Sequence, residues 1–86
     1  MFYVYAIYSL RYDKIYAGVS SNPEGRLVAH NHPSNKGFTK KFQPWIIVFS
    51  EICSSKSDAL KREKQLKSFQ GRLFIRNLIS KLNQIK

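Results

Sequence analysis

One carboxylate, that of Glu63, falls within the apolar stripe of a predicted helix. Residues three or four apart share a helix face, and Glu63 stands at this spacing from Ala59 and Leu66. An ionised carboxylate that faces a core is costly unless a cation neutralises it. A divalent metal ion is one solution, and a partly exposed salt bridge with Arg62 or Lys67 is the alternative.

Two tyrosines, Tyr5 and Tyr16, lie in aromatic and β-branched segments that predict strands at residues 2–9 and 15–20. The segment 10–14 predicts a tight reversal, and we expect a loop of even length, which puts both tyrosines on one face of the hairpin. Tyrosine assists proton transfer only where cations or a metal-bound water offset its intrinsic pKa of about 10. The alternative is that both rings are core aromatics whose hydroxyls still need partners.

Arg26 and His30 are four residues apart in a segment that predicts a short helix from Pro23 to about His30, with Asn22 as its cap. Both side chains then project from one face and reach the same substrate group. Arginine suits phosphate because of its charge and its forked donors. The alternatives are ordinary solvation for Arg26 and a helix C-terminal cap for His30.

Basic and aromatic residues alternate in the polar segment 31–44, which predicts a mobile loop. Its lysines suit a nucleic-acid backbone, and a phenylalanine ring suits stacking on a base. The alternative is a solvated loop with one buried aromatic residue. The expected nucleic-acid contacts are Lys36, Phe38, Lys40 and Lys41.

The elements that must position these residues form an α+β pattern. Trp45 to Ile52 predicts a third strand, and Lys56 to about Phe69 predicts a helix that Gly71 ends. A final amphipathic helix is expected at about 72–84, packed on the core. The order predicts a small three-stranded, antiparallel-leaning sheet flanked by helices.

Composition limits the partner and the location. Lysine and arginine number 15 against 5 acidic residues, and the net charge of +10 attracts nucleic acid or anionic lipid. The 86 residues are expected to form a single domain, 1–86. The longest apolar run, Trp45 to Phe49, is far short of the roughly 20 residues of a membrane span. With one cysteine, Cys53, and no leader pattern, we expect a cytoplasmic protein without membrane association.

Two tripeptides, Tyr3-Val4-Tyr5 and Tyr16-Ala17-Gly18, resemble the two signature tripeptides of the GIY-YIG nuclease domain at a spacing typical of that family. The segments 22–30 and 56–71 are similar to the helices that follow in the family. The resemblance spans nearly the whole chain up to about Arg72.

The resemblance implies a compact, single-domain GIY-YIG endonuclease that hydrolyses DNA phosphodiester bonds with a divalent ion, Mg2+ or alternatively Mn2+. It assigns Tyr5 and Tyr16 to the tyrosine pair, Arg26 to the scissile phosphate and Glu63 to the ion. His30 matches a position that is histidine in some members. In the implied mechanism a tyrosine assists deprotonation of water, the ion stabilises the leaving oxygen, and the arginine offsets the phosphate charge.

Some positions depart from the family pattern. Tyr3 replaces the first signature glycine, Ala17 replaces isoleucine, and Gly25 stands where a charged helix former is commoner. Many members use an asparagine beyond the metal glutamate, and the nearest candidate here, Asn77, has a spacing that does not match.

The expected substrates are DNA rather than RNA, as flaps, branches or damaged strands in repair, recombination or processing. Specificity is expected to be low or supplied by a protein partner. The alternative function is a non-catalytic nucleic-acid-binding module on the same scaffold. A second alternative is an interaction protein whose basic surface binds an acidic protein or anionic lipid, and it predicts little salt-sensitive binding to nucleic acid.

Overall fold

A three-stranded sheet forms the centre of the protein in a computed structural model that describes residues 1–84 and the side chains of residues 1–82. Its strands are β1 (Phe2–Ser9), β2 (Lys14–Ser20) and β3 (Ile46–Cys53), in the order β2-β1-β3. Both pairings are antiparallel, so the predicted three-stranded sheet is confirmed. The last two residues of the predicted 1–86 domain lie outside the described residues.

The hairpin of β1 and β2 sets the faces of the two candidate tyrosines. β2 begins at Lys14, one residue earlier than predicted, and its pairing with Ser9 leaves residues 10–13 as the loop, an even number. Tyr5 lies opposite Gly18, and Tyr16 lies opposite Ile7. Since side chains alternate along a strand, the two tyrosines share one face of the sheet, as the even loop predicts.

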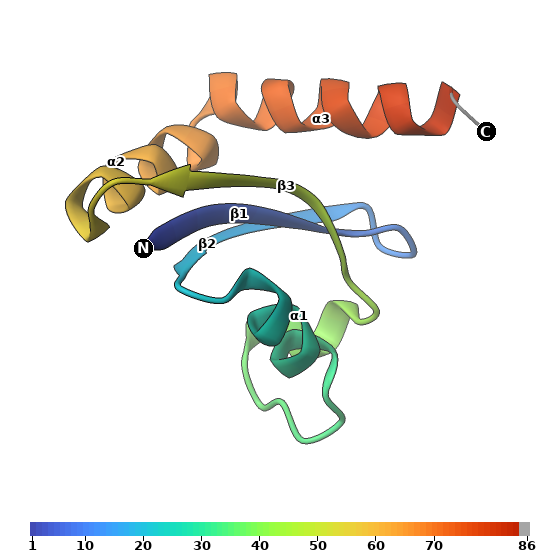
Figure 1. Cartoon of the computed structure of the whole chain (residues 1–86). Coiled ribbons are helices and arrows are strands. Elements are labelled where there is room, and N and C mark those ends of the chain that lie inside the picture. The colour runs from blue at the N-terminus through green and yellow to red at the C-terminus, as the bar shows by residue number, and fades with distance from the viewer. Residues whose placement is uncertain (85–86) are drawn as a thin grey trace.

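Helices cover both faces of the sheet (Figure 1). One face carries α1 (Pro23–Asn31) and the short 3-10 helix η1 (Phe38–Phe42). The long helix α3 (Phe69–Gln84) runs along the opposite face, and α2 (Lys56–Lys67) lies beside one end of it. Within residues 1–84, no helix is long and apolar enough to cross a membrane.

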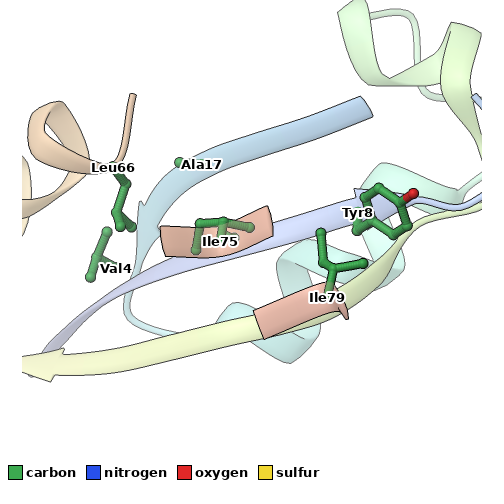
Figure 2. Packing of buried hydrophobic residues seen from close by; sticks show 7 residues of the cluster. Val4, Tyr8, Ala17, Leu66, Ile75 and Ile79 are labelled. Carbon is green, nitrogen blue, oxygen red and sulfur yellow. The ribbon is translucent and has the colours of Figure 1, made fainter. Parts of the chain in front are cut away.

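The alternation of side chains along β1 divides the apolar residues between two cores. The core under α3, shown in Figure 2, contains Val4, Ala6, Tyr8, Ala17, Leu66, Ile75 and Ile79. The smaller core on the other face contains Tyr5, Ile7 and Trp45, with Tyr16, Leu27 and Phe42 packed against it. The two candidate tyrosines therefore belong to the core that also supports α1 and η1.

The break between α2 and α3 falls at Ser68, so the prediction that Gly71 ends the helix is wrong. The Ser68 N–H donates to the Gln65 carbonyl oxygen at 3.1 Å, and the Ser68 hydroxyl accepts from the Gly71 N–H at 3.2 Å. Ser68 thus ends one helix and caps the next. A Cβ at Gly71 would lie 2.7 Å from the Leu66 carbonyl carbon, so the glycine allows the two helices to approach closely.

The segment predicted as a mobile loop contains η1, and hydrogen bonds attach it to its neighbours. Thr39 is buried, and its carbonyl oxygen accepts from Trp45 Nε1 at 2.8 Å. The Asn31 side chain pairs with both backbone groups of Trp45, at 2.7 and 2.9 Å. The prediction is therefore corrected for residues 38–42, which form an anchored helical turn.

Candidate active site

A pocket of about 360 Å³ opens where α1 and α2 approach β2, an edge strand of the sheet. Four of the predicted site residues line it. The hairpin supplies Tyr5 and Tyr16, α1 supplies Arg26, and α2 supplies Glu63. The hairpin and two helices, of which α2 is distant in sequence, thus bring two hydroxyls, a guanidinium and a carboxylate around one open space.

Tyr5 packs closely against β2 because the facing residue is a glycine. Tyr5 is only 1% exposed. A Cβ at Gly18 would lie 2.7 Å from the Tyr5 hydroxyl oxygen and 2.8 Å from its Cζ, closer than van der Waals contact allows. The glycine that ends the second signature tripeptide therefore makes room for the tyrosine that ends the first.

His30 lies in the last turn of α1, but His32 is the C-cap, and the buried His30 ring contacts Tyr5 and Thr39 instead of the helix end. Its ring is 6% exposed, and Nε2 lies 3.0 Å from the Tyr5 hydroxyl oxygen. Nδ1 lies 2.9 Å from Thr39 Oγ1, and the ring also meets Tyr16 edge to face at 5.2 Å between centroids. His30 reaches the pocket through Tyr5 and does not line it.

Burial and Arg26 together govern the protonation of Tyr5 and His30. Burial raises the pKa of the Tyr5 hydroxyl, the Arg26 guanidinium opposes this rise through a hydrogen bond and its charge, and the charges of Tyr16 and Glu63 add to it. Burial lowers the pKa of His30, and the positive charge of Arg26 lowers it further. The neutral forms of both side chains are therefore favoured at neutral pH.

Glu63 forms one of the two salt bridges that the sequence allows, the one with Lys67. Its side chain is 22% exposed, and Oε2 lies 3.2 Å from Lys67 Nζ. Arg62 instead pairs with Glu51 on β3, at 2.8 Å. The salt bridge with Lys67 is therefore present, yet the carboxylate still lines the pocket.

The donor set at the pocket suits a hydrated metal ion but forms no metal cage. Within residues 1–84, no group of three or more histidine, cysteine, aspartate or glutamate side chains is placed to hold an ion. Glu63 is the one carboxylate among the described residues that line this pocket. Mg2+ commonly keeps several waters and binds through one or two carboxylates together with substrate phosphates. Glu63 fits that mode, in which a bound phosphate helps to hold the ion.

Of the predicted nucleic-acid contacts, Phe38 lies nearest the site. Its ring is 59% exposed and lines a second pocket, which shares Tyr16 and Arg26 with the first. The predicted lysines are exposed on the same segment but line neither pocket, namely Lys36, Lys40 and Lys41.

Some residues at the site have no counterpart in the sequence-based prediction. Lys56 and Leu60 line the pocket together with Glu63, and their helical spacing from that carboxylate is a signal that could have identified them. Thr39 contacts His30 from η1, and no local pattern marks it. Asn77 is exposed on α3 and does not line the pocket.

Comparison with known proteins gives a match over most of the chain. Residues 1–74 match the family described as GIY-YIG catalytic domain. A UPF0213 protein of Staphylococcus haemolyticus is 37% identical over 67 residues, 78% of this chain and 80% of that protein. A UPF0213 protein of Staphylococcus saprophyticus is 34% identical with the same coverage, and one of Staphylococcus epidermidis is 33% identical over 55 residues, 64% of this chain and 67% of that protein. No solved structure gives a significant match.

Proposed function

The chain belongs to the GIY-YIG catalytic domain family of nucleases, and on this premise we propose that it is a metal-dependent endonuclease that hydrolyses DNA phosphodiester bonds. One observation supports this proposal most. Tyr5, Tyr16, Arg26 and Glu63 line a single pocket, although they come from a hairpin and two helices. If the two tyrosines served only to pack the core, the Arg26 guanidinium and the Glu63 carboxylate would not need to line the same pocket.

Each side chain has a chemical role that matches its surroundings. Glu63 would hold a hydrated Mg2+ or Mn2+ ion, which supplies positive charge beside the leaving oxygen when bound. Arg26 is exposed at the pocket and would offset the charge that accumulates on the phosphate oxygens. A tyrosine hydroxyl, Tyr5 or Tyr16, would assist removal of a proton from the attacking water. His30 would orient Tyr5 through their hydrogen bond of 3.0 Å.

The surface beside the pocket supports a nucleic-acid substrate. The net charge is +10, and the exposed Phe38 ring adjoins Arg26 in the second pocket. We propose that Phe38 stacks on a base and that three lysines contact the backbone near it, namely Lys36, Lys40 and Lys41. In this proposal the single domain acts on flaps, branches or damaged DNA, with low specificity or with a protein partner. The free thiol of Cys53 fits the proposed cytoplasmic location.

Cleavage assays on labelled single-stranded, duplex and branched DNA, with Mg2+ or with a chelator, test the proposal. We expect cutting in Mg2+ and none with the chelator. Glu63→Gln is expected to lower the cleavage rate by about a hundredfold or more while DNA binding is retained. Glu51→Gln is the matched control, because Glu51 is also ion-paired but lies on β3 outside the pocket. Equal losses in both variants would contradict the role of Glu63.

The Lys67 ammonium on Glu63 favours one other function, a nucleic-acid-binding module without catalysis. A carboxylate neutralised by lysine needs no metal ion to be stable in the fold. Under this alternative the parent protein binds DNA in a salt-sensitive manner but cuts no substrate in Mg2+ or Mn2+.

A further inference from the structure

A buried chain of hydrogen bonds runs from the pocket to the loop before η1. The Tyr5 hydroxyl oxygen lies 3.0 Å from His30 Nε2, and His30 Nδ1 lies 2.9 Å from Thr39 Oγ1. The Thr39 Oγ1 in turn lies 2.8 Å from Asn35 Nδ2. His30 and Thr39 are 6% and 4% exposed, whereas Asn35 is partly exposed at the rim of the second pocket.

The Asn35 amide fixes the direction of the chain. Its Oδ1 accepts from the Gly37 N–H at 2.8 Å, and its Nδ2 donates to the His30 carbonyl oxygen at 3.0 Å. In a flipped amide, the nitrogen would face the Gly37 N–H and the oxygen would face the His30 carbonyl oxygen, and neither pair can form a hydrogen bond. Nδ2 therefore also donates to Thr39 Oγ1, whose own proton remains to be placed.

Among the described protein groups, the Thr39 hydroxyl proton has one hydrogen-bond acceptor. Within the described side chains, no buried nitrogen or oxygen lacks a hydrogen-bond partner, and the contacts of Thr39 Oγ1 are Asn35 and His30. Since Asn35 Nδ2 only donates, the threonine O–H donates to His30 Nδ1. A neutral imidazole that accepts at Nδ1 carries its proton at Nε2 and donates it to the Tyr5 oxygen.

We propose that Thr39 is a positioning residue that fixes the His30 tautomer, so that Nε2–H donates to Tyr5 and the Tyr5 proton points into the pocket with Arg26 and Glu63. In the opposite tautomer, Nε2 would accept the Tyr5 proton and withdraw it from the pocket. The catalytic consequence rests on the proposed nuclease function, because it assumes that Tyr5 faces a substrate phosphate or its attacking water. The tautomer itself does not depend on that function.

The His30 tautomer is measured directly by 15N NMR of the ring nitrogens in the full-length protein at neutral pH. The sequence contains two histidines, so a His32→Asn background leaves the His30 signals alone. We expect the parent and Thr39→Ser to be protonated at Nε2, and Thr39→Val to lose this preference.

Cleavage kinetics provide the second measurement. Thr39 lines the second pocket but is buried, and valine keeps nearly the same shape, so Thr39→Val should lower kcat by about tenfold to a hundredfold with little change in KM. Thr39→Ser should restore kcat, and urea unfolding checks that each variant is folded.

Two results would overturn the inference. They are protonation of Nδ1 in the parent and an unchanged tautomer in Thr39→Val. A parent that has the expected tautomer but cuts no DNA would reject the nuclease proposal and leave the role of Thr39 in setting the tautomer intact.

Discussion

Gly18→Ala is expected to disable the site by displacing Tyr5 while the fold is retained. The new Cβ would lie 2.7 Å from the Tyr5 hydroxyl oxygen, whereas ordinary van der Waals contact begins at 3.4 Å. The ring must therefore retreat by about 0.7 Å, the difference between these two distances. Tyr5 is 1% exposed and bonded to His30 at 3.0 Å, so the retreat strains a packed core and a hydrogen bond together.

The size of the effect follows from this displacement. Overpacking of a well-packed core costs about 1–3 kcal/mol in the free energy of unfolding. A misplacement of about 1 Å at a reacting group costs up to about a hundredfold in rate, so we expect Gly18→Ala to lower the cleavage rate by about tenfold to a hundredfold. The two effects have one cause, the position of the Tyr5 ring.

Single-turnover cleavage in Mg2+ and urea unfolding measure these two quantities. Gly37→Ala is the control, because Gly37 lines the adjoining pocket but a Cβ there would lie an ordinary 3.4 Å from Asn35 Oδ1. The control should match the parent in both assays. If Gly18→Ala also cuts and unfolds like the parent, then Tyr5 is not confined by β2 as argued.

Three further outcomes are expected. Gly71→Ala should lower the free energy of unfolding by about 2 kcal/mol or more in urea, because its Cβ meets the backbone of α2 rather than a side chain that can move. Asp13 has a lowered pKa because a tyrosine hydroxyl and an arginine of α3 bond it, so the stability it contributes is present above its usual pKa of 3.8 and is lost as pH falls through the lower folded value. Asparagine tolerates the local φ of 54°, so Asp13→Asn should remove this loss of unfolding free energy at acidic pH without straining the backbone. If the variant loses stability at acidic pH as much as the parent, Asp13 is not its source. Lys67→Met should tighten Mn2+ binding without DNA by about twofold to fivefold in electron paramagnetic resonance titrations, because it removes the ammonium 3.2 Å from Glu63, whereas Lys64→Met should not.

Local periodicity predicted the hairpin and its tyrosines. The alternation along β1 is a property of the extended backbone, so both of its apolar faces were predictable from residue types alone. The parity of a short loop then fixed the shared face of Tyr5 and Tyr16. Helical spacing likewise placed Glu63 beside Ala59 and Leu66. Only the fold shows that its salt-bridge partner is Lys67 and not Arg62.

The errors arise where three-dimensional packing overrides a local preference. Glycine commonly follows the last residue of a helix, which favoured Gly71 as a helix end. In the structure Gly71 instead lies within α3, where the missing side chain allows α2 and α3 to approach closely. His30 shares a predicted helix face with Arg26, and the sequence does not reveal that β1 and η1 enclose its ring. Thr39 and Asn35 act through contacts that no spacing rule encodes.

Gly25 illustrates how a departure from the family pattern can preserve the site. Glycine within a helix costs up to about 1 kcal/mol relative to alanine, which suggests a weakened support for Arg26. The Gly25 N–H, however, donates to the Asn22 cap at 3.2 Å, and a Cβ at this position would lie 2.6 Å from the Asn22 amide nitrogen. A helix cap contributes about 1 kcal/mol to stability, so the Asn22 cap offsets the low helix propensity of Gly25. The helix therefore keeps a fixed start one turn before Arg26, the residue of the proposed phosphate contact.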